Sequence, residues 1–195
     1  MAYSINATQD HCYPGTTVLI NKLGLKSQEA LDQAERISVT LHTVELEAEE
    51  FTAPFTFSFY CHLHKVLFED LYEWAGQLRT IDLSKKGTSF YPAEKLEYYG
   101  EAKFRYLSSQ NEFQNLDRAD FVEKIAEFYH ELNMLHPFRE GNGRTQRLFF
   151  ALLIRRCGYQ INFADCDLDE LLIATIYAAQ GVITNLVDFF QEAIQ

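Results

Sequence analysis

Apolar residues recur at intervals of three and four along most of this 195-residue chain, the spacing that places side chains on one face of a helix. Polar residues fill the opposite positions, and turn-forming residues separate one such stretch from the next. The expected helices, in chain order, cover approximately residues 17–23, 28–49, 54–74, 93–110, 117–135, 145–157, 171–180 and 186–194. The pattern therefore predicts a mostly helical chain.

One segment departs from this spacing. Between Arg79 and Tyr91, two short stretches alternate apolar and polar residues on either side of residues 84–87, which have the composition of a turn. This pattern predicts a β-hairpin. Because an isolated hairpin is marginally stable, we expect it to pack on the helices. The predicted fold class is all-α, a helical bundle with one short β-hairpin.

The twelve residues from His136 to Arg147 join two of the predicted helices. Pro137 disfavours helical geometry at His136, so the first helix should end there. The second helix begins with backbone N–H groups that have no partner inside the helix, and its dipole favours negative charge at that end. Gly141 and Gly143 would let the backbone approach a bound group closely. The segment is therefore a candidate phosphate site.

Four side chains of this segment suit a polyphosphate and proton transfer. Arg144 and Arg147 are three residues apart, on one side of the second helix, and each guanidinium can bind phosphate oxygens in pairs. Glu140 offers a hard oxygen ligand for Mg²⁺ shared with a polyphosphate. His136, with an ordinary pKa of about 6.5, can accept a proton at neutral pH. Each residue alone would most simply be a helix cap, part of a turn or a solvated side chain. It is their combination at this spacing that predicts a site for polyphosphate binding and proton transfer.

The motif His-Pro-Phe-x-Glu-Gly-Asn-Gly-Arg-x-x-Arg, which runs from His136 to Arg147, resembles that of Fic-domain proteins. These proteins transfer AMP from ATP to a hydroxyl group of a target protein. The resemblance implies the Fic fold, in which the hairpin lies over the motif as a flap and holds the target by strand addition. It also implies a protein adenylyltransferase with ATP as co-substrate and Mg²⁺ as cofactor.

The same resemblance implies a role for each residue of the motif. His136 would be the general base toward the target hydroxyl, and Glu140 would be the Mg²⁺ ligand. Phe138 would anchor the loop in the core, and Tyr177 and Gln180 would line the adenine pocket. The implied phosphate ligands are the backbone of Gly141, Asn142 and Gly143 and the side chains of Arg144 and Arg147.

Other activities stay open at this stage. A kinase branch of the family replaces the second loop glycine with lysine, so Gly143 favours nucleotidyl transfer, yet the transferred group could be UMP, GMP, phosphocholine or phosphate. The chain could also be a non-catalytic adaptor that holds a peptide along the hairpin, although such a module has no need of this motif. His62 and His64, two residues apart on a helix, cannot bind one ion together and are predicted to be ordinary polar or interhelical residues.

Length and charge narrow the choice of partners. The 195 residues predict one domain, with an N-terminal extension at about residues 1–26 and a core at about residues 27–195. The net charge of −11 argues against direct binding of nucleic acid or of an anionic membrane. Four cysteines without metal-binding spacing, and a polar start without a signal-peptide pattern, favour the cytoplasm. Export by a specialised secretion machine stays open.

The mode of inhibition is inferred from the absence of a complete inhibitory-helix motif in the sequence. Many Fic proteins carry an inhibitory helix, Ser/Thr-x-x-x-Glu-Gly/Asn, whose glutamate pairs with the second motif arginine, here Arg147. Residues 43–47 match the first half of that pattern, but Ala48 follows. The resemblance to the short toxin–antitoxin branch therefore implies a small antitoxin in trans, with gyrase or topoisomerase IV as the first candidate targets. A degenerate inhibitory element in cis around Glu47 stays open.

Overall fold

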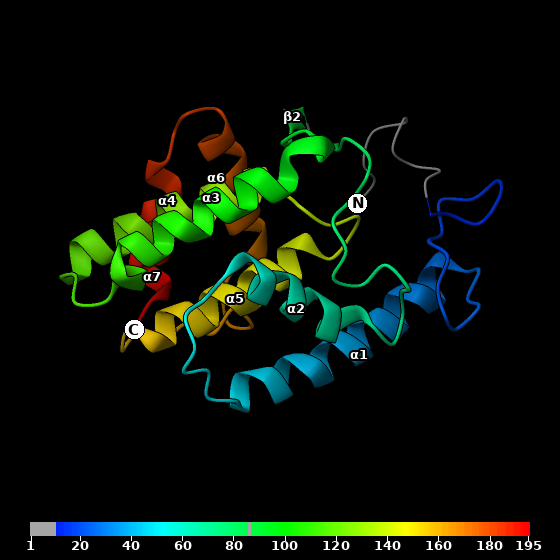
Figure 1. Cartoon of the computed structure of the whole chain (residues 1–195), viewed down its shortest axis with the longest axis horizontal. Helices are drawn as coiled ribbons and strands as arrows, with labels where there is room; N and C mark the ends of the chain where they lie inside the picture. Colours follow the sequence, from blue (N-terminus) through cyan, green and yellow to red (C-terminus); the bar gives the residue numbers. More distant parts are fainter. Residues whose placement is uncertain (1–10, 86) are drawn as a thin grey trace.

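A computed structural model of the chain describes residues 11–85 and 87–195. The α-helices within these residues are α1 (Gln28–Ala48), α2 (Phe57–Phe68), α3 (Leu96–Ser109), α4 (Arg118–Leu135), α5 (Asn142–Arg156), α6 (Leu168–Ala179) and α7 (Thr184–Ala193) (Figure 1). Two short 3₁₀ helices, η2 (Ala93–Lys95) and η3 (Asn111–Phe113), flank α3. None of the described helices combines the length and apolar content needed to cross a membrane. Residues 1–10 of the predicted extension and Lys86 lie outside the described residues.

Side-chain caps explain where several helices begin. In each case an oxygen of the residue before the helix accepts a hydrogen bond from an N–H of the first turn. These caps are Ser27, Thr56, Asp117 and Asp167, before α1, α2, α4 and α6. The predictions of helices at 28–49, 93–110, 117–135, 145–157, 171–180 and 186–194 are confirmed to within a few residues at each end.

The helices pack around the pair α4 and α5. Helix α5 contacts α2 and α4, while α1 lies along α2 and α5 at one edge of the molecule (Figure 1). On the other side, α3, α6 and α7 all pack against α4. Aromatic rings fill the space between these faces, among them Tyr60, Phe104, Phe128 and Phe149. The N-terminal end of α5 therefore lies where α1, α2 and the end of α4 meet.

The predicted helix at residues 17–23 is wrong. Cys12 and Leu19 instead form an isolated antiparallel bridge, and Ile20 N donates to the His11 carbonyl at 2.7 Å. The chain reverses through the turn that begins at Pro14 and Gly15, where the glycine has φ 74°. Because that turn folds the segment back on itself, its carbonyls pair across the loop and not along a helix.

The limits predicted for the second helix are also wrong. This helix begins at Phe57 and not at Pro54, because Thr56 accepts a hydrogen bond from Phe59 N at 3.1 Å and fixes the start. It ends at Phe68 and not near Trp74. Residues 69–76 form successive turns, in which Leu71 N and Tyr72 N both donate to the Phe68 carbonyl.

The predicted hairpin is confirmed in shortened form. Strand β1 (Ser84–Lys85) pairs antiparallel with β2 (Thr88–Ser89), and Phe90 N extends the pairing by donating to the Leu83 carbonyl at 3.1 Å. Gly87, at φ 82°, supplies the left-handed residue of the turn. Leu83, the residue before β1, is buried and packs against the side chains of Ile81 and Phe90.

Candidate active site

His136 ends α4 in a left-handed conformation. Its backbone has φ 43° and ψ 58°, and its N–H donates to the Leu132 carbonyl as the last bond of the helix. Pro137 accounts for the departure from helical geometry, as predicted. A non-glycine residue in this region is strained and persists only where its surroundings hold it. The histidine is thereby turned away from the helix axis, at the start of the motif loop.

Hydrogen bonds from Arg79 stabilise the strained backbone of His136. The Arg79 side chain is fully buried, and its Nε donates to the His136 carbonyl at 2.8 Å. Its backbone N–H donates to the Pro137 carbonyl, also at 2.8 Å. The remaining guanidinium nitrogens donate to the carbonyls of Ile81 and Tyr91, at the two ends of the hairpin segment. One arginine therefore ties the hairpin to the strained turn, a role that its place in a predicted strand did not suggest.

The imidazole of His136 is buried and neutral. Phe90 of the hairpin stacks on it, with ring centroids 3.8 Å apart and planes 5° apart. Burial lowers the pKa of His136 to about 3, and the positive charges of Lys85 and Arg79 act in the same direction. Nδ1 lies 3.3 Å from the Asn133 carbonyl, which makes Nδ1 the protonated nitrogen and leaves the lone pair on Nε2. The ring is therefore a proton acceptor at neutral pH.

The motif loop is braced from within. Asn142 accepts a hydrogen bond from Phe138 N at 2.8 Å and donates to the Phe138 carbonyl at 2.7 Å. Phe138 is fully buried and stacks on His64 at 3.8 Å between ring centroids, so it anchors the loop as expected. The Asn142 side chain is thus occupied inside the loop, and only its backbone can serve a phosphate. Because Gly141 caps the helix at φ 80°, α5 starts three residues before the predicted Thr145.

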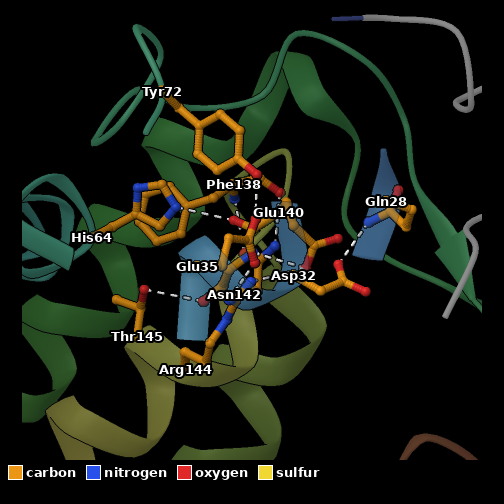
Figure 2. Close-up of polar contacts among 11 residues, drawn as sticks. Gln28, Asp32, Glu35, His64, Tyr72, Phe138, Glu140, Asn142, Arg144 and Thr145 are labelled. Atoms are coloured by element: carbon orange, nitrogen blue, oxygen red, sulfur yellow. Dashed lines mark hydrogen bonds and ion pairs between the residues drawn. The ribbon is translucent and has the colours of Figure 1, made fainter. Parts of the chain in front are cut away.

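His64 of α2 supports the motif loop, which agrees with its prediction as an ordinary polar or interhelical residue. It is fully buried, its Nε2 lies 3.0 Å from the Glu140 carbonyl, and its Nδ1 accepts from Gly76 N at 2.8 Å. This arrangement requires a neutral ring, protonated on Nε2 only. Burial accordingly lowers the pKa of His64 to about 3. Figure 2 shows the His64 ring beside Phe138.

We expect the two buried histidines to make stability depend on pH. Folded His64 and His136 stay neutral down to a pH near their lowered pKa values of about 3, whereas the unfolded chain binds these protons near 6.5. The unfolded state therefore binds more protons in this window, and stability is complete above about pH 6.5 and falls as the pH drops toward about 3. Melting temperatures of the wild type measured at intervals from about pH 7.5 to about pH 4.5 should show this fall.

The matched variants are His64→Asn and His62→Asn, since His62 is exposed on the same helix. His64→Asn should melt lower than the wild type at neutral pH but lose less further stability on acidification. His62→Asn should follow the wild-type curve. An equal acid slope in the wild type and His64→Asn would show that His64 takes up no proton on unfolding.

The two loop glycines face opposite ways. A Cβ on Gly141 would lie 2.4 Å from the Phe68 ring and 3.2 Å from His64 Nε2, so this glycine is required by the protein interior. A Cβ on Gly143 would meet only Arg147 Nη1, at 3.4 Å. Close approach of a ligand, which was predicted for both glycines, therefore fits Gly143 alone.

Within the described part of the chain, the start of α5 leaves backbone N–H groups without partners, as the predicted anion cradle requires. Among residues 11–85 and 87–195, the N–H groups of Asn142 and Gly143 have no hydrogen-bond partner. The next two, of Arg144 and Thr145, both donate to the Gly141 carbonyl. Two amides at the positive end of the helix dipole are thus available to an anion.

The charged side chains of the motif meet at this cradle. Glu140 accepts from Gly141 N at 2.9 Å and lies 3.7 Å from Arg144 Nη2. Arg144 also pairs with Glu35 of α1 (Figure 2). Arg147 has no carboxylate partner among the described residues, and burial lowers the pKa of its guanidinium. The loop therefore presents a carboxylate and two arginines at one helix end.

A cavity of about 620 Å³ joins these groups. Its inner wall comes from the motif: His136, Glu140, Gly141, Gly143, Arg144 and Arg147. Lys85, Thr88 and Phe90 of the hairpin and Asp32, Glu35 and Arg36 of α1 form two further sides. A further wall comes from α6 and is mostly apolar, with Leu168, Leu171, Leu172 and Ile176 beside the polar Asp169 and Thr175. The arrangement suits a ligand with a phosphate chain at one end and a planar apolar group at the other.

The predicted adenine-pocket residues are not in this wall. Neither Tyr177 nor Gln180 lines the cavity, and Tyr177 is 44% exposed. Successive helical residues point about 100° apart, so the face that carries Leu172 and Ile176 directs Tyr177 elsewhere. Sequence reasoning also missed Glu35, Arg79 and Phe90, and it did not foresee the contact of His64 with the motif loop. Of these, Glu35 carried a usable signal, since it stands four residues from Leu31 and from Val39 on the apolar face of its helix.

Comparison with known proteins gives a consistent result. Residues 54–154 match the sequence model of the Fic/DOC family. The chain is 32% identical over 186 residues to "Probable protein adenylyltransferase Fic" of Escherichia coli (strain K12), covering 94% of this chain and 91% of that protein. It is 34% identical over 168 residues to "Protein adenylyltransferase VbhT" of Bartonella schoenbuchensis, which covers 86% of this chain but only 35% of that longer relative.

Solved structures share the fold over nearly the whole chain. The BepC protein of Bartonella tribocorum, with bound AMPPNP, superposes with a TM-score of 0.92 at 26% identity, covering 98% of this chain and 99% of that chain. The N-terminal Fic domain of a VirB-translocated effector protein from Bartonella quintana, with bound ADP, gives a TM-score of 0.92 at 25% identity, covering 97% and 96%. The fold of this chain is thus one that binds adenine nucleotides in these relatives.

Proposed function

Since the chain belongs to the Fic/DOC family, we propose that it is a protein adenylyltransferase that binds ATP in the cavity between the motif loop, α1, α6 and the hairpin. The observation that carries the proposal is the placement of the neutral His136 ring and the unpaired amide of Gly143 at one cavity, next to the second unpaired amide of the described residues, that of Asn142. A base and an anion cradle at a common cavity are what attack of a hydroxyl on a phosphate requires.

The reaction exchanges one bond to phosphorus for another. The oxygen of a target hydroxyl forms a bond to the α-phosphorus of ATP, and the bond from that phosphorus to the β-phosphate oxygen breaks. Pyrophosphate leaves with that electron pair. The hydroxyl proton passes to Nε2 of His136, whose lone pair is set by the Nδ1 contact with Asn133. The product is an AMP ester of the target side chain.

The other residues of the cavity bind and orient the nucleotide. The amides of Asn142 and Gly143 take phosphate oxygens, and Arg144 and Arg147 bind the outer phosphates. The apolar residues of α6 face the nucleoside end of the cavity. Charge that develops on the phosphates meets fixed positive groups, the effect that is usually largest in such chemistry.

Glu140 fits the role of Mg²⁺ ligand. Its carboxylate lies at the cavity beside the phosphate cradle, and one oxygen is held by Gly141 N at 2.9 Å. No group of three metal-binding side chains occurs among the described residues. A single carboxylate suits Mg²⁺, which commonly takes one or two protein oxygens and completes its shell with phosphate and water. When bound, Mg²⁺ would neutralise part of the charge on the polyphosphate.

The target protein is held along the hairpin. Strands β1 and β2 have outer edges that a third, extended strand can join by main-chain hydrogen bonds. Phe90, at the end of this hairpin, stacks on His136 and so links the place of strand addition to the proton acceptor. Gyrase and topoisomerase IV are the first targets to test.

The activity is tested by the mass of a covalent AMP adduct. The purified chain is incubated with ATP, Mg²⁺ and a bacterial lysate or purified gyrase, and proteins are analysed by mass spectrometry. An AMP adduct on a hydroxyl side chain is the expected result. Parallel reactions with GTP and UTP decide the transferred nucleotide, and binding of a peptide without any adduct would favour an adaptor.

A small antitoxin in trans is the proposed control. Arg147 lines the cavity without a carboxylate partner among the described residues, which leaves it available to a glutamate from another chain. A cis element at Glu47 is disfavoured, because the Glu47 carbonyl accepts from Arg155. Arg155 follows Arg147 by eight residues, about 12 Å along α5, so this contact holds Glu47 near Arg155 and not near Arg147. Coexpression of the antitoxin should abolish the adduct, and equal labelling with and without it would refute this control.

A further inference from the structure

Glu35 is a carboxylate at a core position of α1. Leu31 and Val39, four residues before and after it, are buried apolar residues on the same face. The residue itself is only 8% exposed. A buried carboxylate is costly unless hydrogen bonds and opposite charge compensate it. The partners of the Glu35 carboxylate should therefore explain why α1 has an acidic residue at this buried position.

Both oxygens of Glu35 are held. The Tyr72 hydroxyl donates to Oε1, and Arg144 Nη1 donates to Oε2 (Figure 2). Tyr72 is itself rigid, since it is 1% exposed and stacks on Trp74 with ring centroids 4.4 Å apart. Hydrogen bonds at both oxygens fix the Glu35 carboxylate in place at the wall of the cavity. Glu35 is therefore a fixed point for whatever it binds.

What it binds is the first arginine of the motif. The Arg144 guanidinium lies over the Phe68 ring at 4.7 Å and gives one nitrogen to Glu35. Among the described residues, its Nε and Nη2 make no hydrogen bond, and Nη2 is 3.7 Å from Glu140 Oε1. Glu140 is thus the competing partner, one helical turn away on the same side. Without Glu35, Arg144 would be drawn to Glu140.

We propose that Glu35 is a positioning residue for nucleotide binding, which anchors one edge of Arg144 so that the other edge faces the phosphates. It also holds Arg144 Nη2 at 3.7 Å from Glu140 Oε1, beyond hydrogen-bond distance, so that the Glu140 carboxylate remains available for the metal-bound polyphosphate. An arginine held in place before the ligand arrives loses less freedom on binding. The inference rests on the proposed function for the identity of the ligand, but its residues and contacts do not depend on transfer.

Nucleotide binding tests this role without requiring catalysis. Affinity for AMPPNP with Mg²⁺ is measured by calorimetry for the wild type, Glu35→Gln, Glu35→Ala and Tyr72→Phe, with melting temperature as the check on folding. We expect Glu35→Ala to weaken binding about tenfold, as for loss of a charged contact. Glu35→Gln and Tyr72→Phe should have smaller effects, and Glu35→Asp should recover part of the loss. The control is Glu29→Gln, an exposed acid in the first turn of α1, which should bind like the wild type.

A double-mutant cycle with Arg144→Ala separates positioning from a general structural role. If Glu35 acts through Arg144, the double variant should bind no more weakly than Arg144→Ala alone. Additive losses would overturn the proposal. Tighter binding by Glu35→Ala would also overturn it and would make Glu35 a competitor of the phosphates. If the wild type forms no AMP adduct yet shows this coupling, the proposed transfer fails while the role of Glu35 stands.

Discussion

Replacing His136 with alanine is expected to lower AMP transfer by roughly 10²–10⁴-fold, the usual contribution of a general base. The ring is neutral at physiological pH, and its Nδ1 contact with the Asn133 carbonyl leaves Nε2 as the proton acceptor. The proposed phosphate cradle, by contrast, consists of the backbone amides of Asn142 and Gly143, which the substitution does not touch. Transfer should therefore fall while AMPPNP binding remains close to that of the wild type.

The measurement is the initial rate of AMP adduct formation, paired with calorimetric AMPPNP binding. The control is His130→Ala, on the same helix but outside the wall of the catalytic cavity, which should retain wild-type transfer. Because Phe90 stacks on the His136 ring, the effect of losing this packing has to be separated from the effect of losing the proton acceptor. If His136→Ala lost nucleotide binding and melted far below the wild type, the ring would be a structural support and not the base.

The contacts that hold this histidine explain what the sequence could and could not predict. The end of α4 followed from Pro137, because the restriction that proline places on the preceding residue is local. The cradle followed in the same way from the start of the next helix. Both depend on residues within a few positions of each other. Local rules of this kind were sufficient for the motif loop.

Contacts between distant segments were not predictable in this way. Arg79 reaches the His136 carbonyl across 57 positions, and His64 reaches the Glu140 carbonyl across 76. Arg144 pairs with Glu35 across 109. Periodicity marks the buried face of a helix, but it does not say which helix that face meets. A polar residue on such a face indicates that it has a hydrogen-bond or ion-pair partner, but the sequence does not identify that partner.

The same limit explains the errors in secondary structure. Residues 17–23 have helical spacing, yet the turn at Pro14 and Gly15 folds them into a bridge with the preceding segment. The run from Pro54 to Trp74 also has helical spacing, but Trp74 stacks on Tyr72 and His64 in a chain of turns after α2 has ended. In both places, tertiary packing outweighed the local pattern.

Substitution of Gly141 by alanine should destabilise the whole motif loop, by about 2–5 kcal/mol in free energy of unfolding. Two effects add. The backbone at φ 80° is unfavourable for any residue with a Cβ, and the new methyl group would lie 2.4 Å from the ring of Phe68. Because His64 stands 3.2 Å away on the same side, the methyl group cannot be accommodated by a small shift toward it. Chemical denaturation, followed by circular dichroism, measures the loss.

Gly143→Ala is the matched control, two residues further along the same loop. Its Cβ would meet only Arg147 Nη1 at 3.4 Å, at the edge of the cavity, so the protein should fold normally and lose AMPPNP affinity instead. Phe68→Leu, added to Gly141→Ala, should restore part of the lost stability by removing the ring from the clash. Wild-type stability of Gly141→Ala would mean that the loop accepts a side chain at this position, and the requirement for glycine would then come from the ligand and not from the protein interior.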